Sequence, residues 1–351
     1  MLEKFKKILI IRYRFVGDTV LSIPFIKNAR ENFPDAQIDV LVSPNSGELL
    51  EGNPDINNVL YLDTAKKHKY EKTNNTTNTS KTYKSFFFCA TALRKEKYDL
   101  VFVLKRSFSS ALLSFLSGAK TRIGFGTEFR SFLLTCPVKY KGNIHESENF
   151  LNCLTPLKIK ARKYYPEIYP DEREKNKANG FVVRLDKFKP KVLIHASSAH
   201  SYKMWPLRYF AQVMDKLFTD HEAQFVFTGA KSDKHIYEKI LSFSKKRSRF
   251  KILNLCGLTT IKECFAIYKG LDLAICVDSG NAHLAAAADI PTHVLFGPTR
   301  KEKWLPLGKK VFPISLEQPL PCQPCDVKIF CSHKNCMKLL KPQKVLEIVN
   351  C

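Results

Sequence analysis

Short hydrophobic runs alternate with helical patterns along the first half of the chain. Runs rich in Val, Ile and Leu predict strands at residues 7–12, 37–42, 58–62 and 100–104. Apolar residues three or four positions apart predict helices at residues 18–31, 86–95 and 109–116. Continuously apolar strands that alternate with helices indicate a parallel sheet covered on both faces.

The same alternation restarts in the second half. Strands are predicted at residues 191–195, 225–228, 252–255, 273–277 and 292–296, with helices between them. We therefore predict an α/β protein of two doubly wound domains, residues 1–170 and 191–340, joined by a charged linker at residues 171–190. Residues 341–351 are predicted to form a final helix, and the polar stretch 72–84 is interpreted as a solvated insertion.

Composition narrows the class of protein. The chain has 351 residues, 44% of them hydrophobic, which excludes a disordered protein and leaves a core for each domain. The formal net charge is +24, and both halves contribute to it about equally. Such spread charge fits nucleic acid, an anionic membrane surface or acidic small molecules as partners.

The cysteines and the apolar runs bear on the compartment. The apolar run at residues 8–11 is too short for a signal peptide, so we expect a cytosolic protein with reduced thiols. Four of the 11 cysteines lie close together near the end: Cys322, Cys325, Cys331 and Cys336. This spacing could build a structural zinc site, but a cluster of free thiols is the favoured interpretation.

Polar loops that follow predicted strands are candidate sites, because ligands of open α/β sheets bind beyond the carboxyl ends of strands. The first strand is followed by Arg12, Arg14, Gly17 and Asp18. Asp18 could cap the next helix or act as a general base, and from spacing alone the cap is favoured. Arg12 and Arg14 could hold anions or be ordinary surface cations.

Two loops of the second half have the small and polar residues that suit a phosphate at a helix N-terminus. They contribute the candidates Ser197, Ser198, Lys203, Asp278, Ser279, Gly280 and His283. The plain alternatives are a solvated polar loop around Lys203, a helix cap at Asp278 and a surface histidine at His283.

Four segments together carry a family resemblance: KILIIRYRFVGDTVLSIPF, SAHSYKMWPLRYFAQV, VDSGNAHLAAAADIPTHVLFGPT and EKWLPLG. In order and separation they resemble the bacterial lipopolysaccharide heptosyltransferases, glycosyltransferase family 9. The resemblance implies the GT-B fold, in which two Rossmann-like domains face each other across a cleft. It also implies inverting transfer from an ADP-sugar without a metal ion, with the acceptor held by the N-terminal domain.

The resemblance assigns roles to individual positions. Asp18 matches the proposed general base, and with it the base is favoured over the cap. Arg12 and Arg14, on the same loop of the N-terminal domain, are the candidate acceptor-binding residues. Lys203 and the Asp278–Gly280 turn with His283 match the donor site. Asp233 is a candidate ribose contact, and Leu258 and Thr259 lie where adenine contacts occur. The implied partners are an ADP-sugar, a lipopolysaccharide precursor and an anionic membrane surface, at which the cytoplasmic protein would be peripheral.

Several alternatives stay open. Some segments are similar to enzymes that add the second heptose, which is the favoured interpretation, and others are similar to enzymes that add a later branch heptose. A family 9 transferase that uses another ADP-sugar is a further alternative. A dinucleotide-binding enzyme is disfavoured, because the loop after the first strand has one glycine rather than Gly-x-Gly-x-x-Gly. A basic nucleotide- or nucleic-acid-binding α/β protein is the alternative from another class, but recognised nucleic-acid-binding motifs are absent, so no nucleic-acid partner is expected.

Overall fold

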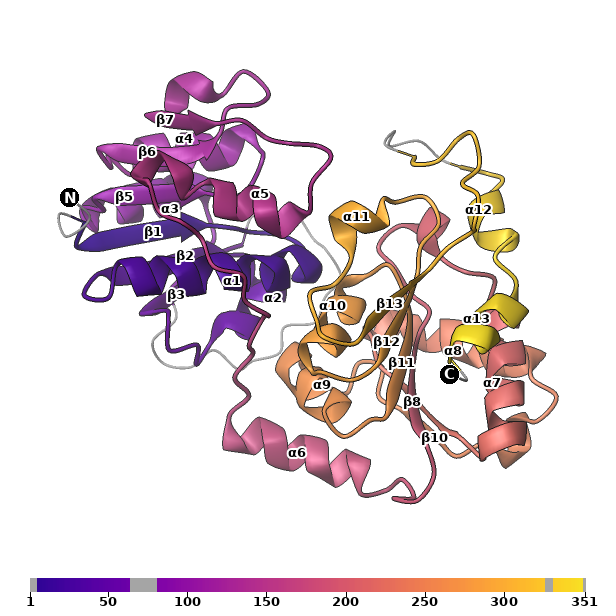
Figure 1. Ribbon diagram of the computed structural model, residues 1–351. Coiled ribbons are helices and arrows are strands. Elements are labelled where there is room, and N and C mark those ends of the chain that lie inside the picture. Colours follow the sequence, from indigo (N-terminus) through magenta and orange to yellow (C-terminus); the bar gives the residue numbers. More distant parts are fainter. Residues whose placement is uncertain (1–4, 64–80, 326–330, 350–351) are drawn as a thin grey trace. The chain divides into compact units, whose positions relative to one another are not determined.

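The computed structural model describes residues 5–63, 81–325 and 331–349 (Figure 1). The chain divides into two compact units, Met1–Tyr169 and Pro170–Cys351. Each unit is a parallel sheet with helices on both faces (Figure 1). No helix within the described ranges is both long and apolar enough to cross a membrane.

The first unit has seven strands in the order β4-β3-β2-β1-β5-β6-β7, and every neighbouring pair is parallel. Its strands are β1 (Lys7–Ile11), β2 (Gln37–Val42), β3 (Asn58–Leu62), β4 (Lys81–Tyr83), β5 (Leu100–Val103), β6 (Thr121–Phe125) and β7 (Cys136–Val138). Its helices are α1 (Val16–Asn32), α2 (Pro44–Gly47), α3 (Phe86–Lys95), α4 (Phe108–Leu116) and α5 (Glu146–Asn152), with short 3₁₀ turns at Glu48–Leu50, Ser131–Leu133 and Thr155–Leu157.

Both faces of this sheet are buried, which explains why its strands are apolar throughout. Leu9 and Ile11 of β1 point to the face covered by α3 and α4, where they share one buried cluster with Leu93 and Leu113. On the other face, Phe102 of β5 meets Phe25 of α1 edge to face, with ring centroids 5.0 Å apart. Alternate strand positions therefore face different helices.

The second unit has six parallel strands in the order β10-β9-β8-β11-β12-β13. They are β8 (Lys191–His195), β9 (Gln224–Phe227), β10 (Ile252–Asn254), β11 (Leu273–Val277), β12 (Thr292–Leu295) and β13 (Val311–Ile314). The helices are α6 (Glu172–Val182), α7 (Leu207–His221), α8 (Lys234–Phe243), α9 (Ile261–Tyr268), α10 (Gly280–Ala287), α11 (Lys301–Trp304), α12 (Asn335–Lys338) and α13 (Pro342–Val349), and 3₁₀ turns lie at Ser201–Lys203, Lys231–Asp233 and Arg247–Arg249.

Trp205 ties the end of the chain to the second unit. Its side chain is 1% exposed and packs edge to face on Phe210, and its indole Nε1 donates to the carbonyl of Leu340 at 2.8 Å. Val345 of α13 belongs to the same buried cluster, so α13 is held by the core of this unit.

Two expectations from the sequence need correction. Residues 171–190 were expected to be a linker, yet most of this segment is α6, which begins with a capping box between Asp171 and Glu174 and packs on α9. The capping box supplies acceptors for backbone N–H groups that would otherwise be free at the start of the helix. A charged composition alone does not distinguish such a helix from a solvated linker. The polar stretch 72–84 was expected to be a loop, but Lys81–Tyr83 forms edge strand β4, and residues 72–80 lie outside the described residues.

Both sheets have one point at which the direction of strand addition reverses. In the first sheet this point lies between β1 and β5, and in the second between β8 and β11. The connections of the two flanking strands leave toward opposite faces there, which opens a crevice at the carboxyl ends of the strands. The loops after β1, β5, β8 and β11 are therefore where each fold can hold a ligand.

Gly257 lies where the loops after β9 and β10 touch. Its φ is +75°, its N–H donates to the carbonyl of Gly229 at 2.9 Å, and an added Cβ would lie 2.9 Å from the Cα of Lys231. We expect Gly257→Ala to lower the free energy of unfolding by about 1–2 kcal/mol, because an L side chain disfavours positive φ.

Gly180 of α6 is the matched control, since an added Cβ there meets no atom within 4 Å. Gly180→Ala should raise stability by roughly 0.5–1 kcal/mol through helix propensity. Urea titration of both variants checks the pair, and equal effects in the same direction would contradict the argument.

Candidate active site

The loop after β1 brings Asp18 to the first switch point. Arg14 and Phe15 have φ values of +84° and +36°, which are uncommon for residues other than glycine and give the turn between β1 and α1 its shape. Phe15 is the N-cap residue of α1, and Asp18 lies in the first helical turn. The interpretation of Asp18 as a helix cap is therefore wrong.

Asp18 is instead paired with Arg12. Arg12 Nη2 lies 2.7 Å from Asp18 Oδ1, and the two side chains are 6% and 14% exposed. The N-terminal end of α1 adds a favourable field for the carboxylate. Within the described ranges no hydrogen bond reaches Oδ2, so one oxygen is fixed and the other is available.

The loop after β5 adds residues that the sequence analysis missed. Lys105 Nζ lies 3.7 Å from the centre of the Tyr13 ring, and the Arg106 guanidinium lies 3.9 Å from the ring of Tyr140. Tyr140 donates to the buried carboxylate of Glu146 at 2.5 Å. The sequence held a signal for the first two, because Lys105 and Arg106 directly follow a predicted strand.

The pKa of Lys105 is lowered from 10.5 to about 7. Burial is the largest cause, followed by repulsion from Arg14 and Arg12, while Asp18 acts in the opposite direction. These couplings place Lys105, Arg12, Arg14 and Asp18 in one electrostatic group at the first switch point.

The second switch point joins the loops after β8 and β11. Lys203 Nζ lies 2.7 Å from Asp278 Oδ2, with side-chain exposures of 18% and 8%. Thr299, from the loop after β12, donates its hydroxyl to the same oxygen at 2.6 Å. Asp278 therefore holds Lys203 at the carboxyl edge of the sheet, and it is not the helix cap.

The N-cap of α10 is Ser279, whose side chain makes no capping hydrogen bond. Its Oγ is buried and has no hydrogen-bond partner within the described part of the chain. Gly280 is the first residue of α10, and His283 lies one turn further in with 4% exposure. The sequence candidates of this loop are thus gathered at one helix N-terminus.

The three remaining donor-site candidates lie on the loops after β9 and β10. The carboxylate of Asp233 accepts from the backbone N–H of Ala230 at 2.9 Å, which shapes its own turn. Leu258 is 57% exposed, and the Thr259 hydroxyl lies 3.1 Å from the Cys264 sulfur. The Gly257–Gly229 hydrogen bond joins these two loops.

Comparison with known proteins decides the family. A model of glycosyltransferase family 9 (heptosyltransferase) matches residues 87–336, which is more than half of the chain. The chain belongs to this family. The expected family, the glycosyltransferase class of enzyme and the α/β fold are therefore confirmed.

Relatives of this family 9 transferase are similar over most of its length. Lipooligosaccharide heptosyltransferase 2 of Campylobacter jejuni is 29% identical over 97% of this chain and 96% of its own. Lipopolysaccharide heptosyltransferase 3 of Escherichia coli is 30% identical over 84% of each chain. The structure of the Escherichia coli ADP-heptose heptosyltransferase II has a TM-score of 0.77 at 23% identity, covering 98% of this chain and 97% of that one.

A buried polar network lies under the second switch point of the transferase, and the sequence did not reveal it. His195 ends β8 and is 3% exposed. Asn281 Nδ2 donates to its Nε2 at 3.2 Å, which leaves Nδ1–H to donate to the carbonyl of Thr228 at 3.2 Å. Ser197 Oγ lies 3.3 Å from the same Nε2. The network thus joins the loop after β8 to the start of α10.

Ser198 lies beside this network on the same loop, with its hydroxyl accepting from the N–H of His200 at 3.4 Å. This weak contact leaves Ser198 in a polar loop next to Lys203. Ser197 and Ser198 therefore differ, since the first is tied to His195 and the second is closer to solvent.

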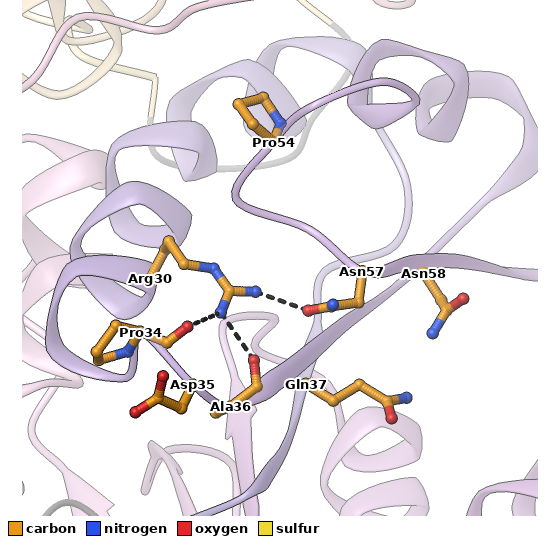
Figure 2. Close-up of a pocket in the computed structure, with 8 residues that line it drawn as sticks. All are labelled: Arg30, Pro34, Asp35, Ala36, Gln37, Pro54, Asn57 and Asn58. Atoms are coloured by element: carbon orange, nitrogen blue, oxygen red, sulfur yellow. Dashed lines mark hydrogen bonds between the residues drawn. The ribbon is translucent and has the colours of Figure 1, made fainter.

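A hollow in the first unit lies at the opposite edge of its sheet. It is lined by Arg30 and by residues that precede or begin β2 and β3, among them Gln37 and Asn58 (Figure 2). The Arg30 guanidinium donates to the carbonyls of Pro34 and Ala36 and to Asn57 Oδ1 (Figure 2). These bonds fasten the end of α1 to the segments that precede β2 and β3.

The cysteine cluster gives no metal centre in the described ranges, where no group of three or more His, Cys, Asp and Glu side chains is placed to hold an ion. Cys336 is buried, and its sulfur lies 3.1 Å from where a Cβ on Gly297 would be. Burial raises the pKa of its thiol to about 11, with the other three cysteines as minor contributors.

His195 predicts a pH dependence of stability. Burial lowers its pKa from 6.5 to about 4, so between these values the unfolded chain binds more protons than the folded protein. Stability therefore falls as the pH drops from about 6.5 toward 4, by up to about 1.4 kcal/mol per pH unit for this group. We expect His195→Gln to flatten this slope.

The measurement is urea unfolding between pH 4.5 and 7.5. The exposed His221 provides the control, since His221→Gln should keep the wild-type slope. A wild-type slope in His195→Gln would contradict the neutral buried imidazole. The slope is compared rather than the absolute stability, because His195→Gln also alters the network.

Proposed function

We propose that this transferase moves heptose from ADP-heptose to the inner core of lipopolysaccharide, on a lipid A–Kdo–heptose acceptor. The observation that carries the proposal is the placement of Asp18 and of the Lys203–Asp278 pair at the two switch points. The names of the relatives, heptosyltransferases 2 and 3, supply the sugar and the acceptor class. The alternative is transfer of a later branch heptose or of another ADP-sugar.

The first unit holds the acceptor in this proposal, and Asp18 is the general base. Arg12 fixes Oδ1, so Oδ2 can take the proton of the acceptor hydroxyl as its oxygen forms the bond to the anomeric carbon. The bond from that carbon to ADP breaks on the opposite face, and its electron pair stays on the diphosphate. A single displacement of this kind inverts the anomeric centre.

The second unit holds ADP-heptose. The diphosphate is stabilised by the charge of Lys203 and by the N-terminal N–H groups of α10. The buried Ser279 hydroxyl and His283, one turn inside the helix, are further proposed contacts. Asp233 is proposed for the ribose, and Leu258 and Thr259 for adenine, because their two loops are joined. These fixed groups would stabilise the leaving charge without a metal ion.

Two variants should separate the two roles. Asp18→Asn should lower kcat by about 10²–10⁴, because it removes the base. It also removes the charge paired with Arg12, but both residues lie in the first unit, so ADP affinity should stay near wild type. Lys203→Met should weaken ADP binding by about tenfold or more through the lost charge-assisted contact. ADP release with ADP-heptose and truncated lipopolysaccharide acceptors gives the first readout, and calorimetric titration with ADP gives the second.

Lys203→Met leaves Asp278 buried without its cation, which is itself destabilising. The double variant Lys203→Met/Asp278→Asn removes both charges and controls for misfolding, with the same loss of ADP affinity expected. Near-normal turnover of Asp18→Asn would rule out the base. Release of ADP from a different nucleotide sugar alone would overturn the heptose assignment.

A membrane contact is part of the same proposal. Phe108 at the start of α4, Phe129 and Phe132 are 50%, 94% and 71% exposed, and the rings of Phe108 and Phe132 are 6.4 Å apart. Phe108 and the exposed Arg106 follow β5, so they lie at the same edge of the sheet as Asp18. Exposed aromatic rings beside a cation suit the interface of an anionic bilayer, where the lipid acceptor resides.

We expect the wild-type protein to sediment with vesicles that contain anionic lipid at low salt, and less so at high salt. The variant Phe129→Ser/Phe132→Ser should lose most of this binding, whereas Phe312→Ser, an exposed phenylalanine of the second unit, should not. Vesicle binding that is equal in all three proteins would exclude this surface as the membrane contact.

A further inference from the structure

Three cations gather around one carboxylate at the first switch point. Arg12 is 5% exposed, and its Nε is buried without a hydrogen-bond partner in the described part of the chain. Its Nη2 is paired with Asp18, and its Nη1 contacts the carbonyl of Tyr13 at 3.3 Å. A buried guanidinium N–H normally finds an acceptor, so Arg12 retains unused donor capacity beside Asp18.

Lys105 is the second cation of this group. It stacks on Tyr13, which is fixed in turn by a 2.8 Å hydrogen bond between its hydroxyl and Ser109. In the residues that the structure describes, no carboxylate lies within ion-pair distance of Lys105 Nζ. Its charged neighbours are Arg12, Arg14 and Asp18, so repulsion outweighs attraction.

We propose that Lys105, with Arg12 and Arg14, forms a subsite for an anionic group of the acceptor, a phosphate or a carboxylate, next to the hydroxyl that reacts. The inference rests on the proposed function for the nature of the acceptor, and on the orphaned Nε and the unpaired ammonium for the subsite. The subsite would place positive charge beside the base Asp18. It would position the acceptor by attracting the acceptor's anionic group.

Protonation of Lys105 is coupled to this binding. With a pKa of about 7, the free enzyme holds a substantial share of neutral amine near neutral pH. A bound anion offsets the repulsion from Arg12 and Arg14 and favours the ammonium. The affinity of the subsite should therefore rise as the pH falls through 7, and anion binding should take up protons.

The first test uses substitution. Lys105→Met keeps most of the length of the side chain and removes the charge, so the acceptor KM should rise about tenfold or more with ADP affinity unchanged. Lys105→Arg should restore much of the affinity. Lys120→Met, which removes an exposed lysine before β6, is the matched control and should leave the acceptor KM unchanged. An unchanged KM in Lys105→Met overturns the proposal.

The second test does not depend on turnover. Limiting acetic anhydride should acylate Lys105 faster than Lys120 at pH 7, with a rate that levels off above pH 8, as read by peptide mass spectrometry. Saturating ADP is added first to fill the proposed diphosphate site of the second unit. The added anions can then act only at the subsite around Lys105. Inorganic phosphate in one arm of the experiment and gluconate, a carboxylate, in another should slow the labelling of Lys105. The anion that protects Lys105 more strongly identifies whether the subsite takes a phosphate or a carboxylate.

The two tests separate this proposal from the proposed function. Protection of Lys105 by an anion in a protein that fails to use ADP-heptose would retain the subsite and discard the heptose assignment. Full heptose transfer, without protection of Lys105 by anions and without an effect of Lys105→Met on KM, would retain the heptose assignment and discard the subsite. Labelling of Lys105 at the rate of Lys120 overturns the subsite.

Discussion

The reversal of strand order in each sheet is the constraint on which the rest of the structure depends. Right-handed crossovers place successive helices on one face of the sheet until the strand order reverses. At the point of reversal, the connections that follow two neighbouring strands lead to opposite faces of the sheet. β1 and β5 in the first unit, and β8 and β11 in the second, are these strands. Every charged pair assigned to chemistry lies on a loop that leaves one of them.

The buried polar network below the second switch point shows how such loops are held in place. His195 is the last residue of a central strand, and its neutral ring bonds to Asn281 at the start of α10. Because burial keeps the imidazole uncharged, it can join loop, strand and helix without adding charge under the candidate diphosphate site. Lys203 is held by Asp278 rather than by His195, so the cation and the buried network do not compete for the same hydrogen-bonding groups.

The sequence predicted most central elements, because buried parallel strands are continuous apolar runs. It missed β4, β6, β7 and β13, which are short edge strands or carry polar residues such as Arg122. α6 was missed because a charged composition hides its capping box. At the site, residue order placed Asp18 and Lys203 on the correct loops, but their partners Arg12 and Asp278 are set by tertiary contacts that no local pattern contains.

The cations of the site fall into two kinds, and the difference follows from their partners. Arg12 and Lys203 each bind a carboxylate, so an incoming anion must share them with Asp18 or Asp278, and part of its attraction is lost. Among the described residues, the charged groups that act on Lys105 are the cations Arg12 and Arg14 and the carboxylate of Asp18, so an anion there relieves repulsion as it binds. The net charge of +24 therefore matters less than the placement of a few cations, since most lysines of the described ranges are exposed to solvent. The paired cations Arg12 and Lys203 fix geometry, and in our proposal Lys105 supplies the response to the ligand.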